Sequence, residues 1–408
     1  MRSDRLAEPA GLHLDIRPKL RIGLLWHSAR SGNLGVGALT LGNMAIARAV
    51  AEELGYAPEF TLLSMRDHET DPIVPPEVKI RTIDARALLS PAAYWRWIGE
   101  LDCVLDIGAG DSFAEIYGPK RFGFLLLSKV LVILKRKPLV LSPQTIGPFS
   151  KRAYRWPASV VMRKCAAVVA RDDKSLVVAR QMAPDANNLL SVDVAFVLPF
   201  TNQASRRGSA RPQVGLNVSG LLMEEALSGR NRFGLSYDYA AFSRQLITAL
   251  QERGFKVHLV PHATSKVIPE DDDGRYIDLL VAEFPEAIRV ADFANPSDAK
   301  TYLSGLDFVV AARMHCCIGA FSAGVPVVPI SYSRKFDGLF GMLGYPWVAP
   351  TTGLDQAGMV QFVLEAFDKR SHLAASIEQA LHNVGQRLDV YREALRKAFL
   401  SSRGVPAQ

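Results

Sequence analysis

The sequence of 408 residues lacks the patterns that identify several classes of protein. Its few cysteines form no CxxC pair, which argues against a zinc knuckle or a disulfide framework and favours a reducing compartment; they are Cys103, Cys165, Cys316 and Cys317. The first twenty residues contain acidic side chains and no continuous apolar stretch, so no secretory signal is expected. The most apolar window, Phe122–Leu134, is interrupted by Lys129 and is too short to span a bilayer, which favours a buried helix.

Composition limits the class of the chain further. Hydrophobic residues make up 49% and charged residues 22% of the sequence, close to the average of globular proteins, so disordered and fibrous classes are excluded. At about 150 residues per domain, the length predicts two to three domains. The net charge of +7, from 48 Lys and Arg against 41 Asp and Glu, is interpreted as a mild excess spread along the chain. That argues against a nucleic-acid partner and indicates anionic ligands or an anionic membrane surface.

Strand-like apolar runs alternate with helical patterns along most of the chain. Several runs are continuous and rich in Val, Ile and Leu, as strands buried on both faces of a parallel sheet should be. The expected strands are 21–26, 60–63, 103–107, 138–141, 166–170, 213–218, 256–260, 308–312 and 326–330. This alternation predicts an α/β protein with doubly wound, Rossmann-like parallel sheets.

One polar segment interrupts the alternation. Residues 199–212, PFTNQASRRGSARP, combine small residues and arginines between prolines and are expected to form a linker. The linker predicts an N-terminal domain over residues 1–202 and a C-terminal domain over residues 213–370. Residues 371–408 are expected to form a last helix, because apolar residues recur there at spacings of three and four: Leu373, Ile377, Leu381, Val384, Leu388, Tyr391, Leu395 and Phe399.

Loops that follow strands are the first candidates for function, because ligands of such sheets bind outside the carboxyl ends of the strands. The loop 27–37, HSARSGNLGVG, does not have the dinucleotide spacing GxGxxG. It is therefore either a tight turn or an anion site that includes Asn33 and Gly35. The loop 108–113, GAGDSF, offers Gly110 for a close backbone approach, and Asp111 as a hydroxyl-binding carboxylate or a helix cap.

Two later loops of the first half carry polar groups as well. Residues 142–148, SPQTIGP, are expected to form a rigid turn in which Gln144 is a polar contact. Arg171 ends a strand directly before two aspartates. An ion pair with a neighbouring carboxylate is its simpler role, and binding of an anion is the alternative.

In the second half, basic groups gather around the start of one helix. Arg313 and His315 stand where a helix of small residues follows a buried strand, and Lys335 comes after the next strand. Two basic groups at a helix N-terminus oppose the helix dipole, so they indicate an anionic ligand rather than stability. Asn217 and His262 also follow strands and are either cleft contacts or structural groups. No cluster has metal-ligand spacing, so no metal is expected.

The ordered set of these motifs resembles the polysaccharide pyruvyl transferase family. Residues 313–344, RMHCCIGAFSAGVPVVPISYSRKFDGLFGMLG, carry Arg-x-His, Ala-Gly-Val-Pro and a later Lys. The motifs NLG at 33–35, GAGDS at 108–112, QTIGPF at 144–149, ARDDKS at 170–175 and DVAF at 193–196 match in order. The resemblance runs from about Ile22 to Gly344. The chain departs from the family's pattern at NLGVGALT, which lacks the family's Asp-Glu pair, and at Ala109, which interrupts a glycine run.

The resemblance implies a two-domain fold like that of GT-B glycosyltransferases. It also implies transfer of pyruvate from phosphoenolpyruvate onto two hydroxyls of a sugar, on a surface polysaccharide or its lipid-linked precursor. By motif, Arg313 and His315 match the donor-binding pair, with His315 as general acid. Asp111 would orient a sugar hydroxyl or act as a base. The other expected contacts are Arg171, Lys335, Asn217 and His262 for the donor, and Asn33, Gly35, Gly110 and Gln144 for the acceptor.

Two other functions are compatible with the same sequence. One is a GT-B glycosyltransferase that uses a nucleotide sugar, and the other is a non-catalytic sugar-binding or assembly protein. No cofactor is expected beyond phosphoenolpyruvate as donor substrate, and a polysaccharide or lipid-linked sugar is the expected acceptor. A cytoplasmic location is predicted, while peripheral contact with the inner face of the membrane and a homo-oligomer both remain open.

Overall fold

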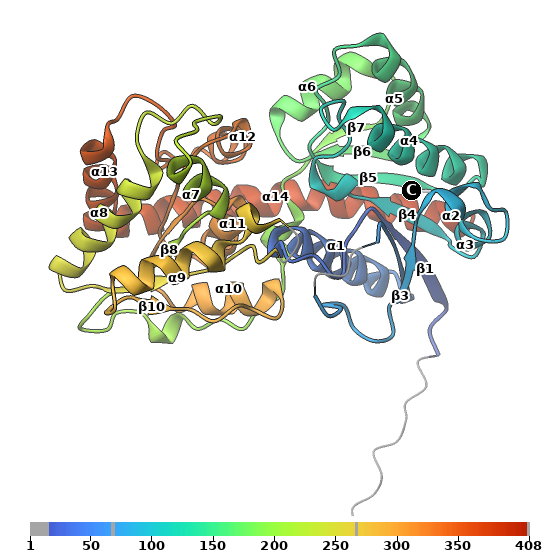
Figure 1. The fold of residues 1–408 in the computed structure, drawn as a ribbon. Helices are drawn as coiled ribbons and strands as arrows, with labels where there is room; N and C mark the ends of the chain where they lie inside the picture. Colours follow the sequence, from blue (N-terminus) through green and yellow to red (C-terminus); the bar gives the residue numbers. More distant parts are fainter. Residues whose placement is uncertain (1–15, 67–69, 266–267, 406–408) are drawn as a thin grey trace, which may run out of the picture.

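The protein has two lobes, each built on one parallel β-sheet, in a computed structural model that describes residues 16–66, 70–265 and 268–405 (Figure 1). The first sheet has the strand order β3-β2-β1-β4-β5-β6-β7, and the second has the order β10-β9-β8-β11-β12. Neighbouring strands are parallel throughout both sheets. The expected fold class of two doubly wound parallel-sheet domains is thereby confirmed.

The first lobe extends from β1 to η2. Its strands are β1 (Lys19–Leu25), β2 (Ala57–Ser64), β3 (Lys79–Thr82), β4 (Cys103–Asp106), β5 (Leu139–Gln144), β6 (Ala167–Ala170) and β7 (Asn188–Leu190). Its helices are α1 (Leu34–Glu53), α2 (Ala85–Leu89), α3 (Tyr94–Gly99), α4 (Gly118–Leu134), α5 (Arg152–Lys164) and α6 (Asp173–Met182), with the 3-10 turns η1 (Gly108–Gly110) and η2 (Val194–Val197).

The second lobe follows a segment with one 3-10 turn, η3 (Ala204–Arg206). Its strands are β8 (Gln213–Asn217), β9 (Lys256–Leu259), β10 (Ile288–Arg289), β11 (Phe308–Ala311) and β12 (Val327–Pro329). Its helices are α7 (Gly220–Leu227), α8 (Tyr239–Glu252), α9 (Asp273–Glu283), α10 (Pro296–Ser304), α11 (Met314–Ser322), α12 (Arg334–Met342) and α13 (Gln356–Asp368), with the turn η4 (Pro269–Asp271). The last helix of the chain is α14 (Arg370–Ser402).

The strands that the sequence indicated are the inner strands of both sheets and one edge strand, β12, whose three residues are buried. Strands β4, β6 and β11 are fully buried runs of four residues, all of them apolar except Asp106 at the end of β4. By contrast β3, β7 and β10 were not predicted, and each is a sheet edge of two to four partly exposed residues. An edge strand covered on fewer sides needs fewer apolar residues, so its sequence signal is weaker.

Strand β5 is longer than expected. It continues through Gln144, with a shift in its pairing to β6 between Leu141 and Gln144. The predicted rigid turn over 142–148 is therefore wrong in its first half, because Ser142–Gln144 belongs to the buried sheet.

Helix α14 returns to the first lobe. It runs behind both lobes in Figure 1, starting next to α13 and ending over β4, β5 and β7. The Tyr391 hydroxyl donates to Asn43 Oδ1 at 2.7 Å and to Ser142 Oγ at 2.8 Å, and the Asn43 amide also lies 2.9 Å from His27 Nε2. This buried polar network fixes the helix to the first sheet. Burial lowers the pKa of His27 to about 3.

The two lobes meet at the start of α1. The Leu34 amide donates to the His262 carbonyl at 3.2 Å, and the Thr264 amide donates to the Gly32 carbonyl at 2.9 Å. Asn33 and Ala263 form a β-bridge at the same place. Main-chain contacts therefore hold the first loop of one lobe against the loop after β9 of the other.

Helix α1 also bears on the question of membrane segments. It is the only helix in the described ranges that is long and apolar enough to cross a membrane, and 72% of its apolar window is buried inside the protein. Core helices of soluble proteins pass the same test.

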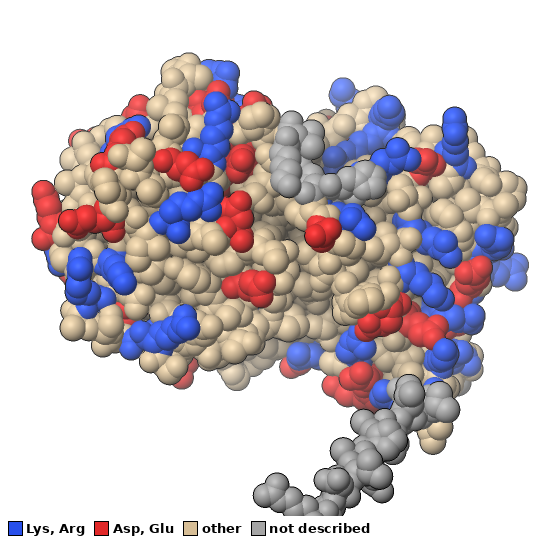
Figure 2. All heavy atoms as spheres, turned by 60° about the horizontal axis from the view of Figure 1, so that its bottom comes forward, with Lys and Arg blue, Asp and Glu red and all other residues tan. Residues whose placement is uncertain are grey.

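The charged side chains of one face are visible in Figure 2, where Lys and Arg predominate in the upper part of the right-hand lobe.

Candidate functional site

A cleft of about 390 Å³ lies at the carboxyl ends of the strands, between the two lobes. Eight of the predicted site residues line it: Asn33, Gly110, Asp111, Arg171, His262, Arg313, His315 and Lys335. The first four belong to the N-terminal lobe and the last four to the C-terminal lobe. The fold thus brings together groups that stand up to 302 positions apart in the sequence, as the carboxyl edges of two parallel sheets facing each other would do.

His315 stands in the first turn of α11 and is mostly buried. Its ring packs against Gly35 of the other lobe so closely that an added Cβ on Gly35 would lie under 3.0 Å from the imidazole Nδ1. Only glycine leaves room for this ring. The predicted contribution of Gly35 is therefore to the placement of His315, and Gly35 itself does not line the cleft.

Asp193 lies next to His315 and was not among the predicted site residues. Its Oδ2 atom is 3.7 Å from His315 Nε2, and that nitrogen is buried without a hydrogen-bond partner among the described residues. Burial of Asp193 opposes its ionisation, but His315 and the charge of Arg171 outweigh burial and lower the pKa of Asp193 to about 2. A permanently ionised carboxylate therefore faces the imidazole.

Arg171 makes the ion pair that was its simpler expected role. Its Nη1 donates to Asp193 Oδ2 at 2.8 Å and its Nε donates to Thr145 Oγ1 at 3.1 Å. The side chain is 5% exposed and lines the cleft beside Gly110. The carboxylate of Asp193 therefore lies against both the Arg171 guanidinium and the His315 imidazole, and the three side chains form one buried cluster.

Arg313 is held by two carboxylates of the second lobe. Its guanidinium donates to Asp271 Oδ1 at 2.6 Å, and to Asp273 Oδ1 at 2.7 Å from Nη2 and 3.0 Å from Nε. Burial disfavours the charged form, but Asp273 and Asp271 outweigh it and raise the pKa of Arg313. The cation that sequence reasoning assigned to the donor is therefore already paired in this structure.

Lys335 and Asp111 pair with each other across the cleft. The Lys335 ammonium donates to Asp111 Oδ2, and the Tyr117 hydroxyl donates to the same oxygen at 2.8 Å. Burial of Asp111 opposes ionisation, but the Lys335 charge and the hydrogen bond from Lys335, followed by the Arg171 charge, hold the pKa of Asp111 below its usual value. Asp111 in this arrangement is a weak base that accepts hydrogen bonds well.

The backbone of the second loop explains how Asp111 reaches the cleft. Gly108, Ala109 and Gly110 all have positive φ angles, of 53°, 49° and 87°, a conformation that favours glycine and is uncommon for alanine. The carboxylate of Asp106, at the end of β4, accepts from the Gly108 amide at 2.8 Å and pairs with the buried Lys129 at 2.8 Å. Lys129, which interrupts the apolar window of the sequence, therefore supports this loop.

His262 and Asn33 face the cleft mainly as structural groups. Burial lowers the pKa of His262 to about 3, with smaller contributions from the charges of His315 and Arg313, so its imidazole is neutral. The Asn33 side chain caps α1 by accepting from the Gly35 amide at 3.0 Å. Both residues border the cleft from the interlobe contact.

Besides Gly35, two predicted contacts do not reach the cleft. Gln144 is fully buried in β5, and its amide nitrogen donates to the Asp106 carbonyl at 2.8 Å. Asn217 is buried at the end of β8, where it accepts from the Arg313 amide at 2.9 Å and donates to the Val260 carbonyl at 2.9 Å. The assignments of Gln144 to the acceptor and Asn217 to the donor are corrected here, because both side chains are buried inside the lobes and neither lines the cleft.

Sequence reasoning also missed groups that shape the cleft. Asp273 begins α9 and holds Arg313, the Gly220 amide and the Asn217 amide. Phe233 and Tyr332 form an aromatic wall with ring centroids 5.1 Å apart. Among the groups that were missed, Asp193 lies in the DVAF motif and Tyr332 lies in the segment 313–344, both of which carry the resemblance, while Asp273 and Phe233 lie in no such motif. No group of three or more His, Cys, Asp or Glu side chains suited to a metal ion occurs in the described part of the chain.

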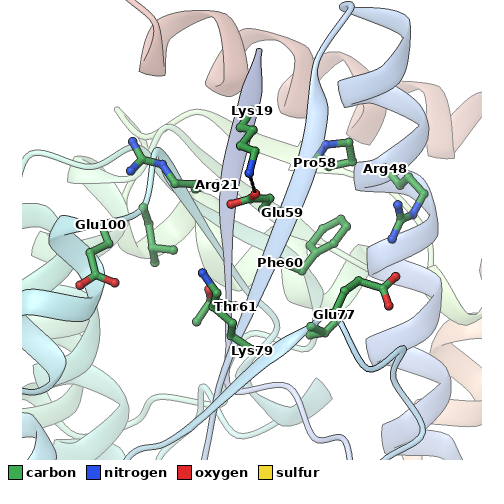
Figure 3. Close-up of a pocket in the computed structure, with 12 residues that line it drawn as sticks. Lys19, Arg21, Arg48, Pro58, Glu59, Phe60, Thr61, Glu77, Lys79 and Glu100 are labelled. Carbon is green, nitrogen blue, oxygen red and sulfur yellow. Dashed lines mark ion pairs between the residues drawn. The ribbon is translucent and has the colours of Figure 1, made fainter. Parts of the chain in front are cut away.

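A second and larger cavity lies at the opposite edge of the first sheet (Figure 3). Its volume is about 630 Å³, and it is lined by the amino-terminal halves of β1 and β2 together with Arg48 and Lys79. Lys19 and Glu59 point toward each other there and form an ion pair of 2.5 Å. No residue of the predicted site lies in this cavity.

Comparison with known proteins identifies the family. The polysaccharide pyruvyl transferase family matches residues 41–334. The chain belongs to the polysaccharide pyruvyl transferase family. Membership supports a transferase that acts in polysaccharide biosynthesis.

Individual relatives are more distant. The chain is 25% identical over 260 residues to the amylovoran biosynthesis protein AmsJ of Erwinia amylovora, and the match covers 61% of each protein, less than two thirds of that relative's length. Among solved structures, it is similar to UDP-GlcNAc 2-epimerase from Neisseria meningitidis, with a TM-score of 0.57, 11% identity and coverage of 93% of this chain and 100% of that one. A trehalose-phosphate synthase from Burkholderia vietnamiensis gives a TM-score of 0.50, 11% identity and coverage of 95% and 100%. These likenesses concern the fold, which is that of GT-B enzymes.

Proposed function

We propose that this polysaccharide pyruvyl transferase moves pyruvate from phosphoenolpyruvate to two hydroxyls of a sugar, and that the donor binds in the cleft between the lobes. The observation that carries the proposal is the juxtaposition of His315 with Lys335, Arg171 and Asp111 at one site of a chain that belongs to this family. A site for a donor with a carboxylate and a phosphate needs cations and a proton donor side by side.

Donor binding in the cleft requires that at least one cation exchanges its present carboxylate partner for the donor. The cations Arg171, Arg313 and Lys335 are matched by carboxylates in this structure. The pair most open to exchange is that of Lys335, since this side chain is 39% exposed while the two arginines are buried. The donor's anionic groups would replace Asp111 at the ammonium. Asp111 is then free to accept a hydrogen bond from a sugar hydroxyl.

His315 supplies a proton in the proposed reaction. It gives the proton to the methylene carbon of phosphoenolpyruvate, whose π electrons form the new C–H bond, and the first sugar hydroxyl bonds to the adjacent carbon. Phosphate leaves with the electrons of its C–O bond, and the second hydroxyl closes the ketal. Of the two hydroxyl protons, one restores His315 and the other leaves with phosphate. Asp193 compensates the positive charge of the ring while it holds both protons.

The proposed location is the cytoplasm, where phosphoenolpyruvate would meet a lipid-linked or polymeric acceptor. No cofactor takes part in this scheme. The acceptor approaches from the side of Gly110, Asp111 and the aromatic wall of Phe233 and Tyr332, which all face the cleft. Aromatic faces pack against the apolar faces of sugar rings, so this wall suits a carbohydrate.

Donor identity is tested by ligand-induced thermal stabilisation and by phosphate release. Phosphoenolpyruvate is expected to raise the melting temperature, as any ligand that binds only the folded state does, and to release phosphate when a suitable sugar is added. UDP-sugars serve as the parallel set and are expected to give no shift. Stabilisation by a UDP-sugar alone would favour a nucleotide-sugar glycosyltransferase, and stabilisation by neither donor would favour a non-catalytic binding protein.

A further inference from the structure

The basic residues of the chain are concentrated in one segment, which corrects the expectation of an evenly spread excess. Residues 116–171 contain 12 Lys and Arg and no Asp or Glu. The other 352 residues contain 36 Lys and Arg against 41 Asp and Glu and are net acidic. The segment covers α4, β5 and α5 of the first lobe, which lie together at the upper right of Figure 1.

Helices α4 and α5 present their starts on one surface. The carboxylate of Glu115, just before α4, accepts from the Ser150 amide at 2.9 Å and the Lys151 amide at 3.1 Å, just before α5. The Phe122 and Tyr154 rings pack edge to face 4.9 Å apart between the two helices. The first turns of both helices are therefore fixed side by side, and the acidic group between them is turned toward backbone amides.

This surface, called here the α4–α5 face, combines exposed cations with exposed apolar side chains. Its cations Lys120, Arg152 and Arg155 are exposed, and the described part of the chain gives none of them an ion pair. The same segments carry Trp156, Ile116 and Tyr117, which are 72%, 62% and 40% exposed. Trp156 follows Arg152 by one helical turn, so both point from the same side of α5.

The α4–α5 face also adjoins the cleft. The Tyr117 hydroxyl that donates to Asp111 belongs to a ring exposed on this face. Beside it lies a mostly apolar groove of about 350 Å³, which shares Lys120 with this face and adds one further cation, Arg121. The groove is lined by Met65, Ile83, Tyr117, Lys120, Arg121, Phe124 and Leu125. A ligand bound on this surface next to Tyr117 would therefore be separated from Asp111 of the candidate site by the Tyr117 side chain alone.

We propose that the α4–α5 face docks on an anionic lipid bilayer, with Trp156 and Ile116 inserted at the interface and the cations on the headgroups. Lipid surfaces of negative charge attract exposed Lys and Arg, and amphipathic Trp settles at the headgroup level. Docking this way places the Asp111 side of the cleft next to the membrane, where a lipid-linked sugar acceptor would be presented. That last consequence rests on the proposed function, while the docking itself does not.

The test is co-sedimentation of the full chain with vesicles of phosphatidylcholine, with and without phosphatidylglycerol, at low and high salt. Binding is expected only with phosphatidylglycerol and is expected to weaken with salt, because salt screens exposed charges. Each cation lost near an anionic surface weakens binding by about fivefold. The double variant Arg152→Glu/Arg155→Glu should therefore bind the vesicles at least about 25-fold more weakly than the wild type. Trp156→Ser should weaken binding as well. Its effect should persist at high salt, because salt does not screen the contact of an uncharged side chain with lipid.

Matched controls lie away from this face, in the segment between the lobes and in the second lobe. The double variant Arg206→Glu/Lys256→Glu makes the same change of charge, and Leu227→Ser removes an apolar side chain that is 51% exposed. Both should bind like the wild type. Equal binding to neutral and anionic vesicles, binding to neither, or equal losses in the control variants would overturn the proposal. So would dextran sulfate binding without vesicle binding, which would indicate an acidic polymer as partner.

Failure of docking and failure of the proposed function remain distinguishable. The thermal shift with phosphoenolpyruvate is measured on the same proteins, and it should be unchanged in Arg152→Glu/Arg155→Glu. A wild-type protein that binds vesicles without responding to phosphoenolpyruvate would refute the donor assignment alone. The reverse result would refute the docking surface alone.

Discussion

The two cavities at opposite edges of the first sheet differ in how their charges are held. At the amino edge, the larger cavity contains the exposed pair Lys19–Glu59, whose side chains are 69% and 38% exposed. At the carboxyl edge, the smaller cleft contains Arg171 and Arg313, each buried and each bonded to a carboxylate that is itself fully buried. Volume alone would have favoured the amino edge.

The difference teaches where function is to be sought in such folds. Exposed ion pairs are worth about 0–1 kcal/mol and arise on any charged surface. Buried ion pairs often contribute no more to stability than apolar residues would, so stability is a weak reason for keeping them. Charges buried in a cleft at the ends of parallel strands, with His315 among them, are more simply explained by a ligand.

The largest effect is expected from His315→Ala. Loss of the general acid should lower the rate of phosphate release about 100- to 10,000-fold, the usual contribution of a positioned acid. The melting temperature should stay close to that of the wild type, because His315 Nε2 has no hydrogen-bond partner among the described residues. His382→Ala, on the exposed side of α14, is the matched control and should react at the wild-type rate.

Asp193→Asn should affect both stability and rate. It leaves the buried Arg171 without its charge partner, and breaking a buried pair costs about 3–5 kcal/mol in the free energy of unfolding, measured with urea. Glu283→Gln, in the exposed pair with Arg244, should cost no more than about 1 kcal/mol. Equal losses in the two variants would contradict the contrast between buried and exposed charges.

The pH dependence separates the two roles of Asp193. Because its pKa is lowered to about 2 from 3.8, the carboxylate contributes stability that is fully present above 3.8 and is lost as pH falls through 2. That loss should be absent from Asp193→Asn. If Asp193 also positions His315, the pH profile of the reaction should be displaced in the variant. An unchanged profile would leave Asp193 with a structural role only.

Gly35→Ala should have a smaller effect, confined to the reaction. The new methyl group would displace the His315 ring, and displacements near 1 Å at a catalytic group cost about 100-fold in rate. Gly123→Ala is the control, since nothing lies within 4 Å of its added Cβ on α4. It should keep the wild-type rate and gain up to about 1 kcal/mol in stability. A Gly35→Ala protein with wild-type rate would mean that the ring position is not important.

The smallest effect is expected at the amino edge. Glu59→Gln removes the exposed pair with Lys19 and should change the free energy of unfolding by less than about 1 kcal/mol. The rate of phosphate release should not change. A clear loss of activity in this variant would assign a function to the larger cavity and weaken the contrast between the two edges.

Much of the fold could be predicted because its central strands are buried on both faces. Runs such as Val168–Ala170 or Phe308–Ala311 can only be apolar, and their alternation with helices shows in the sequence. The edge strands β3 and β10 could not be predicted, since partial exposure allows Lys and Arg in them. The length of β5 was missed because Ser142 and Gln144 are polar, although both are bonded inside the protein.

The sequence predicted where the site residues lie better than it predicted which side chains they bond to. Loops after strands placed Asp111, Arg171, Arg313, His315 and Lys335 on one edge, and the structure gathers them in one cleft. Their pairing could not be predicted, because it depends on carboxylates from remote segments. Asp273 lies 40 positions from Arg313, and no spacing rule connects them. The clustering of cations in residues 116–171 is visible in the sequence, but the net charge of the whole chain does not reveal it.

The most direct test of the account is a crystal structure of the protein with phosphoenolpyruvate. The account predicts the donor in the carboxyl-edge cleft, with an anionic group on the Lys335 ammonium, the methylene carbon facing His315, and Asp111 separated from Lys335. Phosphoenolpyruvate bound in the amino-edge cavity, or an intact Lys335–Asp111 pair in a protein that turns the donor over, would contradict it.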